Sequence, residues 1–402
     1  MINKYSEMKK TLFVITALLL LLRCGDPLKD KNKSIHVHQV NVNLNQNPER
    51  IDLMDIVENL SFIQLETNRE CLLSRIHKVE VFNNRIYISE SGASGKLLCF
   101  DLHGKFLFKI GDKGNGPGEY LFLADFAIDK ENKCLWLSDN FRKILKFDLD
   151  GKFIERYDTD FAMMNLSLLD EKENIMAIRL GYYKDKDYSF IIYSNKKRKI
   201  LYHKSSNHIN TITTIGGAFL SQSKEKIFYT EPFNDTIFNI TKEGIEPYYI
   251  INFGKHALPK EELKSDQPKN IITQFLNPDN KYAGFVMNVS KSSDYLLFNY
   301  DFSGERYTSI FSSKLDKIIT IKEILLIGKS FEASKYFFKY QQNDEYISWL
   351  PAHLLTEQSL SKKEKQYYGK YHEITNLISN LNEDDNPILI FGKFNFDYLF
   401  NE

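Results

Sequence analysis

The residues in this sequence that could do chemistry lie at the ends of expected β-strands. Three of them are carboxylates that follow short apolar segments, namely Glu90, Asp139 and Glu231. Carboxylates gathered in one cleft could hold a metal ion, or two of them could serve as the acid and the base of a sugar hydrolase. Equivalent positions in two other segments carry Arg179 and Tyr300. An arginine among these carboxylates would oppose a bound cation, so the set does not define a catalytic site by itself.

A glycine-rich loop at residues 111–120 contributes two further candidates, Glu119 and Tyr120. Loops of this kind can bind phosphate through backbone N–H groups. A nucleotide-binding loop is followed by a helix, however, and here the chain continues into an apolar segment at 125–129 that predicts a strand. We therefore interpret the loop as the connection between two neighbouring repeats.

All these candidates belong to a repeated pattern. The phrase Phe-Asp-Leu-His-Gly-Lys-Phe at 100–106 returns 47 residues later as Phe-Asp-Leu-Asp-Gly-Lys-Phe at 147–153. Each copy holds four short segments rich in β-branched and aromatic residues, separated by Asn, Gly and Asp turn residues. The segments are 78–82, 85–89, 96–100 and 106–110 in the first copy, and 125–129, 134–139, 144–148 and 152–157 in the second. Four short strands in a repeat of about 45 residues predict a propeller blade.

Weaker copies extend the pattern to the end of the chain. They lie at 193–195, at 238–240, at 282–321, and in a last copy that combines 346–350 with 387–391. The extra segment 60–65 should pair into the last blade, because closing the ring removes exposed sheet edges. The predicted fold class is therefore all-β, a six-bladed β-propeller of four-stranded antiparallel blades. Five or seven blades remain open alternatives.

The predicted ring places the candidate residues on one face. In a four-stranded blade, the connections between blades and the turns after the second strands emerge together. A ligand-binding set should therefore ring one mouth of the central channel, and it consists of Glu90, Glu119, Tyr120, Asp139, Arg179, Glu231 and Tyr300. The alternative is that the carboxylates only accept hydrogen bonds from backbone N–H groups of the turns.

Two stretches interrupt the strand pattern and predict helical insertions, at 258–276 and 359–381. The second has apolar residues at helical spacing, among them Ile374, Leu377 and Ile378, and the polar run 382–387 ends it. We expect this helix to pack on its own blade rather than on a partner.

Composition excludes some classes of function. The chain has 53 basic and 53 acidic residues and no net charge, so no basic field is available to hold nucleic acid. Apolar residues make up 43% of the chain, which is sufficient for a core. The scattered Cys71, Cys99 and Cys134 are no disulfide framework, and the last two lie in apolar segments as expected of buried residues. No metal site or cofactor is predicted, since the pair His36 and His38 lies in a polar stretch.

The N-terminus predicts a targeting segment. Two lysines precede an apolar run at 12–22, which is too short to span a bilayer about 30 Å thick. Cys24 follows the run directly, a pattern similar to a bacterial lipoprotein signal in which this thiol is acylated, although Arg23 departs from the small residue usual there. The predicted domains are a signal peptide at 1–23, a polar tether at 24–49 and the propeller at 50–402. An uncleaved anchor or ordinary secretion are the alternatives.

Several phrases give the chain a family resemblance. Residues 135–153 resemble an NHL-type repeat. Other phrases, at 51–53, 62–67, 110–120, 233–238, 252–255 and 385–387, resemble the uncharacterised six-bladed β-propeller lipoproteins of Bacteroidota. The resemblance implies a six-bladed ring and a place in the bacterial cell envelope, as an outer-membrane lipoprotein facing the periplasm or the surface. It implies no activity and no catalytic residues.

The sequence favours a non-enzymatic binding or scaffold propeller, anchored to the membrane by lipid, that recognises an envelope peptide, glycan or protein. The alternative is an enzyme on the same ring, either a lyase or lactonase with a channel metal or a sugar-acting hydrolase. The fold cannot decide between these classes.

Overall fold

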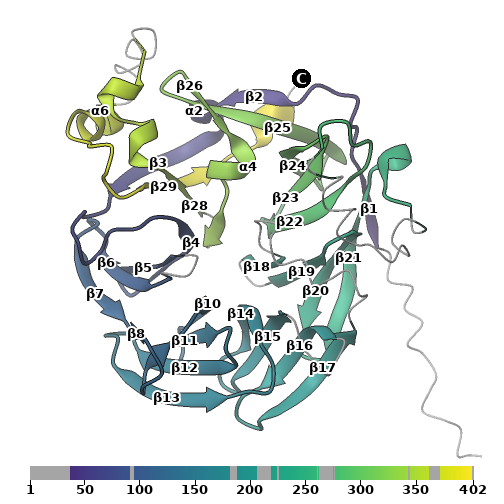
Figure 1. The fold of residues 1–402 in the computed structure, drawn as a ribbon. Helices are drawn as coiled ribbons and strands as arrows, with labels where there is room; N and C mark the ends of the chain where they lie inside the picture. Colours follow the sequence, from purple (N-terminus) through teal and green to yellow (C-terminus); the bar gives the residue numbers. More distant parts are fainter. Residues whose placement is uncertain are drawn as a thin grey trace, which may run out of the picture. The chain divides into compact units, whose positions relative to one another are not determined.

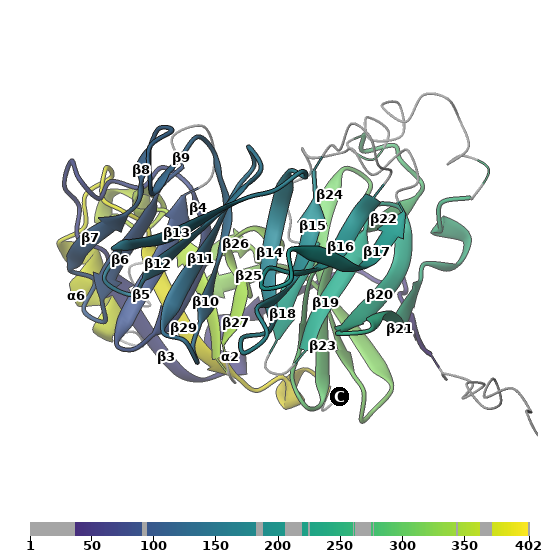
Figure 2. The ribbon, with the colours of Figure 1, turned by 90° about the horizontal axis from the view of Figure 1, so that it is seen from below.

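The computed structural model describes residues 37–90, 95–181, 188–205, 219–223, 226–259, 261, 275, 277–342, 345–361 and 372–400. From His38 onward the chain forms one compact unit. Its six main sheets surround a central axis as the blades of a propeller (Figure 1). The predicted fold class and the count of six blades are confirmed. Figure 2 shows the same ring from its edge.

The first two blades contain four strands each in the order of the sequence. Blade one is made of β4 (Ile76–Phe82), β5 (Arg85–Glu90), β6 (Leu97–Asp101) and β7 (Phe106–Ile110). A small parallel pair, β8 (Asp112–Lys113) and β9 (Glu119–Tyr120), lies in the connection to blade two. Blade two is made of β10 (Leu123–Asp129), β11 (Cys134–Asp139), β12 (Lys143–Asp148) and β13 (Phe153–Asp158). The glycine-rich loop therefore connects two blades, as predicted.

Blades three and four follow the same antiparallel order. Blade three is made of β14 (Met163–Asp170), β15 (Ile175–Leu180), β16 (Tyr188–Ser194) and β17 (Lys199–Ser205). Blade four is made of β18 (Leu220–Ser223), β19 (Lys226–Glu231), β20 (Asn234–Thr241) and β21 (Gly244–Asn252).

Blades five and six complete the ring. Blade five is made of β22 (Ala283–Lys291), β23 (Tyr295–Phe302), β24 (Glu305–Ser312) and β25 (Lys317–Leu326), with β26 (Lys329–Glu332) paired to β25. Blade six is made of β27 (Tyr340–Gln342), β28 (Glu345–Leu350), β29 (Ile388–Phe394) and β3 (Val57–Gln64). Strand β3 pairs antiparallel with β29, so the segment that precedes blade one in the sequence closes the last blade as predicted.

The repeated Asp-x-x-Gly-Lys phrase forms the same turn in blades one and two. Asp101 accepts hydrogen bonds from the backbone N–H groups of His103 and Lys105, and Asp148 accepts the equivalent pair in blade two. The glycine of each turn has a φ of +82°, a left-handed conformation that strains other residues. The phrase is therefore repeated because it builds the hairpin between the third and fourth strands.

The chain joins the ring earlier than the predicted tether boundary at residue 49. Strand β1 (His38–Asn41) pairs in parallel with β21, and β2 (Glu49–Asp52) pairs in parallel with β25. Val40 and Val42 are buried, whereas the polar residues between and beside them are exposed. Strand β1 was not predicted, because it has few apolar residues and lies in a stretch of polar composition. Residues 1–36, with the predicted signal peptide and Cys24, lie outside the described residues.

The short helices are α2 (Leu53–Ile56), α4 (Ala333–Tyr336) and α6 (His372–Ser379), and the 3₁₀ turns are Gly254–His256, Ala352–Leu354, Glu357–Ser359 and Asp397–Phe400. Within the predicted insertion 359–381, residues 362–371 lie outside the description. The remaining helix packs on its own blade, since Ile374 and Ile378 are buried in one cluster with Ile388 and Ile390. Most of the predicted insertion 258–276 is likewise not described, but Phe275 is buried against Phe285.

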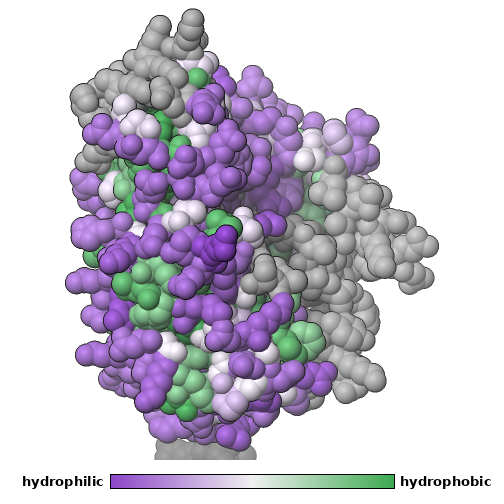
Figure 3. Space-filling model, turned by 60° about the vertical axis from the view of Figure 1, so that its left-hand side comes forward, coloured by the Kyte–Doolittle hydropathy of each residue, from purple (hydrophilic) through white to green (hydrophobic). Residues whose placement is uncertain are grey.

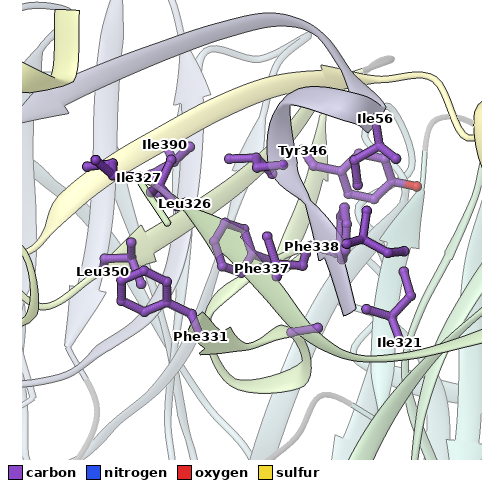
Figure 4. Close-up of a cluster of buried hydrophobic side chains, with 14 of the residues drawn as sticks. Ile56, Ile321, Leu326, Ile327, Phe331, Phe337, Phe338, Tyr346, Leu350 and Ile390 are labelled. Carbon is purple, nitrogen blue, oxygen red and sulfur yellow. The ribbon is translucent and has the colours of Figure 1, made fainter. Parts of the chain in front are cut away.

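Blades five and six share the largest apolar cluster (Figure 4). Residues Phe331, Phe337 and Phe338 from the segment that joins these blades are buried in it. This packing fixes the course of α4, which Figure 1 shows inside the ring beside β24 and β25. Elsewhere in the core, Cys99 and Cys134 are buried as expected, and burial raises the pKa of each thiol to about 12.

Candidate functional site

The central channel holds a cavity of about 1060 Å³. Its wall includes residues from the innermost strand of every blade, namely β4, β10, β14, β18, β22 and β27. Strands β4, β10, β14, β18 and β22 are labelled around the centre of the ring in Figure 1. A concave site of this size at the axis of the ring is large enough for a small ligand.

Glu90 lies at the end of β5 and is buried, with 3% of its surface exposed. Its carboxylate accepts hydrogen bonds from the backbone N–H and the hydroxyl of Ser74, just before β4. Lys96 Nζ lies 3.8 Å from the second carboxylate oxygen. Glu90 therefore stabilises the chain just before the innermost strand of blade one. It is not among the residues that line the cavity.

Asp139 has the same role in blade two. Its side chain is fully buried and accepts hydrogen bonds from the N–H groups of Leu121 and Phe122, at 2.9 and 3.2 Å, just before β10. It also accepts the N–H of Phe141 at 3.0 Å, and the buried Lys143 Nζ lies 3.6 Å away. Asp139 therefore matches the alternative to ligand binding, in which the carboxylate accepts hydrogen bonds from backbone N–H groups of the turns.

Glu231 is bound by side chains of blades three and four. It accepts hydrogen bonds from Tyr229 and Ser189, both at 3.0 Å, and from Asn234 at 3.1 Å. Lys204 Nζ lies 2.7 Å from its other side. Burial, together with this carboxylate, raises the pKa of Tyr229 far above its ordinary value, so the phenol stays protonated as a donor.

The remaining predicted residues are also separated. Glu119 accepts the N–H of Gly116 within the glycine-rich loop, and Tyr120 and Tyr300 are buried in two different apolar clusters. Arg179 alone among the seven lines the cavity, where its guanidinium stacks over Phe219 at 4.7 Å. Desolvation lowers its pKa. Six of the seven candidates therefore lie in turns, in apolar clusters or between blades rather than in the cavity wall.

The cavity wall instead contains basic side chains that were not predicted as site residues. At the end where blades five, six and one meet, the wall includes Arg75, Arg306, Lys335 and Lys339. We call these four residues the basic cluster. Lys335 and Lys339 come from α4 and the segment before β27, the same connection type as the glycine-rich loop. The sequence did carry a signal for this cluster. Two lysines lie four residues apart among aromatic residues, directly before the innermost strand of blade six.

Lys339 is the most perturbed member of the basic cluster. It is half-buried, and its Nζ donates a hydrogen bond of 2.6 Å to the carbonyl of Ser334. Desolvation, followed by the positive charges of Arg306 and Arg75, lowers the pKa of Lys339 to about 7. Arg306 binds Asp301 through two hydrogen bonds of 2.6 and 3.0 Å.

Lys78 is a second charged residue in the cavity wall, and neighbouring carboxylates compensate its charge. Lys78 Nζ donates to the carbonyl of Phe126 at 2.6 Å and lies 2.8 Å from Glu80 and 3.5 Å from Asp125. These neighbours offset the desolvation of Lys78 and raise its pKa. The contacts cross from blade one to blade two, so this group joins two blades.

Within the described ranges, no three His, Cys, Asp or Glu side chains gather closely enough to hold a metal ion. The same part of the chain contains no helix long and apolar enough to cross a bilayer.

The fold and its central cavity define a six-bladed propeller whose channel is lined by the innermost strands of the blades. More particularly, the chain belongs to the family described as Domain of unknown function (DUF4934), whose model matches residues 37–393. No curated protein sequence matches the chain.

The chain also matches two solved structures from Bacteroides. The chain matches a "Putative exported protein" of Bacteroides fragilis with a TM-score of 0.71 and 20% identity, over 89% of this chain and 99% of that one. It also matches a member of the duf4221 family from Bacteroides vulgatus with a TM-score of 0.48 and 12% identity, over 84% of this chain and 97% of that one. At 20% identity, the likeness to the Bacteroides fragilis protein shows the fold alone.

Proposed function

We propose that this protein is a binding propeller of the bacterial cell envelope, without an enzymatic role, that takes a ligand into the central channel. The observation that supports it is the cavity of about 1060 Å³ walled by the innermost strands of all six blades. The carboxylates that could have acted as acid and base are held by hydrogen bonds from backbone and neighbouring side chains. No observation favours the alternative lyase, lactonase or hydrolase.

The character of the outer surface of the ring also favours the channel as the ligand site. Figure 3 shows one side of the molecule that is mainly hydrophilic, with small separate hydrophobic areas. The large apolar side chains that are exposed include Leu72, Leu107 and Ile154, which come from different strands and loops. Single exposed apolar residues of this kind do not form a docking surface.

A substitution that fills the channel tests this function. Gln222 is exposed and lines the cavity from β18, so Gln222→Trp should obstruct the channel without disturbing the core. Gln46→Trp, on an exposed loop outside the channel, is the matched control. A panel of neutral and acidic sugars and short peptides is scored by thermal stabilisation of each purified protein. We expect ligands that stabilise the wild type and the control but not Gln222→Trp. Equal stabilisation of all three, or of none, would contradict the proposal.

The envelope address is the second part of the proposal. It rests on the lipoprotein-like pattern that ends at Cys24, and the similar exported protein of Bacteroides fragilis is consistent with it. Cys24→Ser should abolish labelling by radioactive palmitate and move the protein from the membrane fraction to the soluble fraction. A wild-type protein that takes up no label and is already soluble would overturn the lipid anchor.

A further inference from the structure

The charges at one end of the cavity do not balance. Arg306 is paired with Asp301, and Glu305 is paired with Lys322. After these pairs, Arg75, Lys335 and Lys339 remain, with Glu332 as the acidic neighbour in the same wall. Among the described residues, neither Arg75 nor Lys339 has a carboxylate within ion-pair distance. Lys339 is half-buried, and its charge is costly without a carboxylate partner, whereas Arg75 and Lys335 are exposed beside it. An anion bound at this place would offset the cost at Lys339 and pair with the two exposed cations.

The position of the lysines is built into the fold. Phe337 and Phe338 anchor the segment in the largest apolar cluster, and Lys335 and Lys339 flank them on the cavity side. The backbone is held as well, because Ser334 donates its hydroxyl to the carbonyl of Arg306 at 3.1 Å. The backbone that carries both lysines is therefore held in place, so that only their side chains must become ordered when a ligand binds.

The surroundings of the basic cluster include aromatic side chains. Tyr336, Tyr340 and Trp349 line the same cavity. Tyr340 and Trp349 stack with their ring centres 6.4 Å apart. Aromatic surface beside positive charge suits a ring-shaped ligand that carries an acidic group.

We propose that the basic cluster binds the oxyanion of a small ligand in the channel, a carboxylate, sulfate or phosphate group, with Arg75, Lys335 and Lys339 as its donors. The inference rests on the proposed function, since it specifies the ligand class of the same cavity. Charge-assisted hydrogen bonds from Arg and Lys are the strong contacts that proteins use for such groups.

The low pKa of Lys339 adds a readout that a purely structural lysine would not give. Arg75, Arg306 and Lys335 disfavour its charged form, and Glu332 favours it. A bound anion reverses this balance, so binding takes up a proton near neutral pH. Affinity for the oxyanion should therefore be higher at pH 6 than at pH 8.

Isothermal titration of the purified protein tests the proposal with sodium sulfate, sodium phosphate, glucuronate and, as a neutral match, glucose. We expect at least one oxyanion to bind, glucose to bind at least about tenfold more weakly, and Lys339→Met to lose about tenfold in affinity. Lys329→Met is the matched control, because Lys329 in β26 of blade five also donates to backbone carbonyls but does not line the cavity. Arg75→Gln, with the exposed Arg69→Gln as its control, provides an independent second variant.

The outcomes separate the sources of the oxyanion. Preference for glucuronate over both inorganic ions identifies an acidic sugar, whereas equal binding of all three identifies a site for the free oxyanion. If no oxyanion binds, or if Lys339→Met and Arg75→Gln bind like their controls, the proposal is overturned. A neutral ligand that Gln222→Trp excludes but Lys339→Met retains would overturn the oxyanion site and leave channel binding intact.

Discussion

The carboxylates at the ends of the second strands and the basic cluster lie in the same ring but differ in what they contact. Glu90 and Asp139 each accept hydrogen bonds from the chain that enters the innermost strand of their own blade. Lys339, in contrast, has a single hydrogen bond to a carbonyl and several positive neighbours. The carboxylate of Asp139 and one oxygen of Glu90 are satisfied by donors of the protein itself, whereas Lys339 has no carboxylate partner among the described residues.

This difference shows how charged residues can be sorted within a propeller. A residue that recurs at equivalent places in successive blades, as these carboxylates do, serves the geometry that the blades share. A residue that occurs in only one connection, such as Lys339 before β27, serves something particular to that place. Perturbed charge that faces a cavity is a marker of function, and satisfied charge within a turn is not.

Removing Asp139 should have the largest effect on stability. Asp139→Ala leaves three backbone N–H groups without an acceptor and leaves Lys143 as an uncompensated buried charge. We expect the free energy of unfolding to fall by about 3–5 kcal/mol, measured by urea denaturation. Oxyanion binding at the basic cluster should be unchanged under conditions where the variant is folded.

The matched control for this substitution is Asp150→Ala. Asp150 also pairs with a basic residue, Arg85, but 74% of its side chain is exposed. Its removal should cost about 0–1 kcal/mol. If Asp139→Ala were as mild as Asp150→Ala, the separation of satisfied carboxylates from the basic cluster would lose its basis.

Asn386 extends the comparison to the closure of the ring. It is fully buried, donates to the carbonyls of Glu66 and Cys71, and accepts the N–H of Leu73. These contacts join the chain before β29 to the chain that leads into blade one. Asn386→Ala should lower the free energy of unfolding by about 2–4 kcal/mol, since three backbone groups lose their partner, two of them buried.

The exposed Asn382→Ala, four residues earlier, should change the urea midpoint little and serves as its control. A loss for Asn386→Ala no larger than that of the control would show that the two ends of the ring are held by β3 alone.

The repeat explains why the fold could be predicted and the cavity wall could not. Turn residues such as Gly104 and apolar strands such as 134–139 obey local rules, and their recurrence fixes the blade. The closing strand was predictable because its edge must be paired. Lys335 and Lys339 obey no repeat, and their approach to Arg75 and Arg306 depends on long-range packing of α4. Strand β1 was missed for a related reason, since it is stabilised by its partner β21 rather than by its own composition.

The smallest predicted effect concerns the pH dependence of stability. The pKa of Lys339 is about 7 in the folded protein, below the ordinary value of 10.5, because burial and Arg306 and Arg75 oppose its charge. Between these two pH values the unfolded chain binds more protons at this residue than the folded one, so Lys339 makes stability rise with pH. At pH 6 the lysine is charged in both states and its unfavourable environment is felt in full.

Lys339→Met removes this titration. The difference in unfolding free energy, wild type minus variant, should therefore increase from pH 6 to pH 9. We expect an increase on the order of 1–2 kcal/mol, because solvent in the cavity screens the neighbouring charges. Urea midpoints of both proteins at the two pH values give this difference, and other titrating groups cancel in it. Saturating sulfate should reduce the increase if the anion occupies the basic cluster. A difference that is flat with pH would mean that Lys339 is as well compensated as Asp139, and the contrast between the two regions would fail.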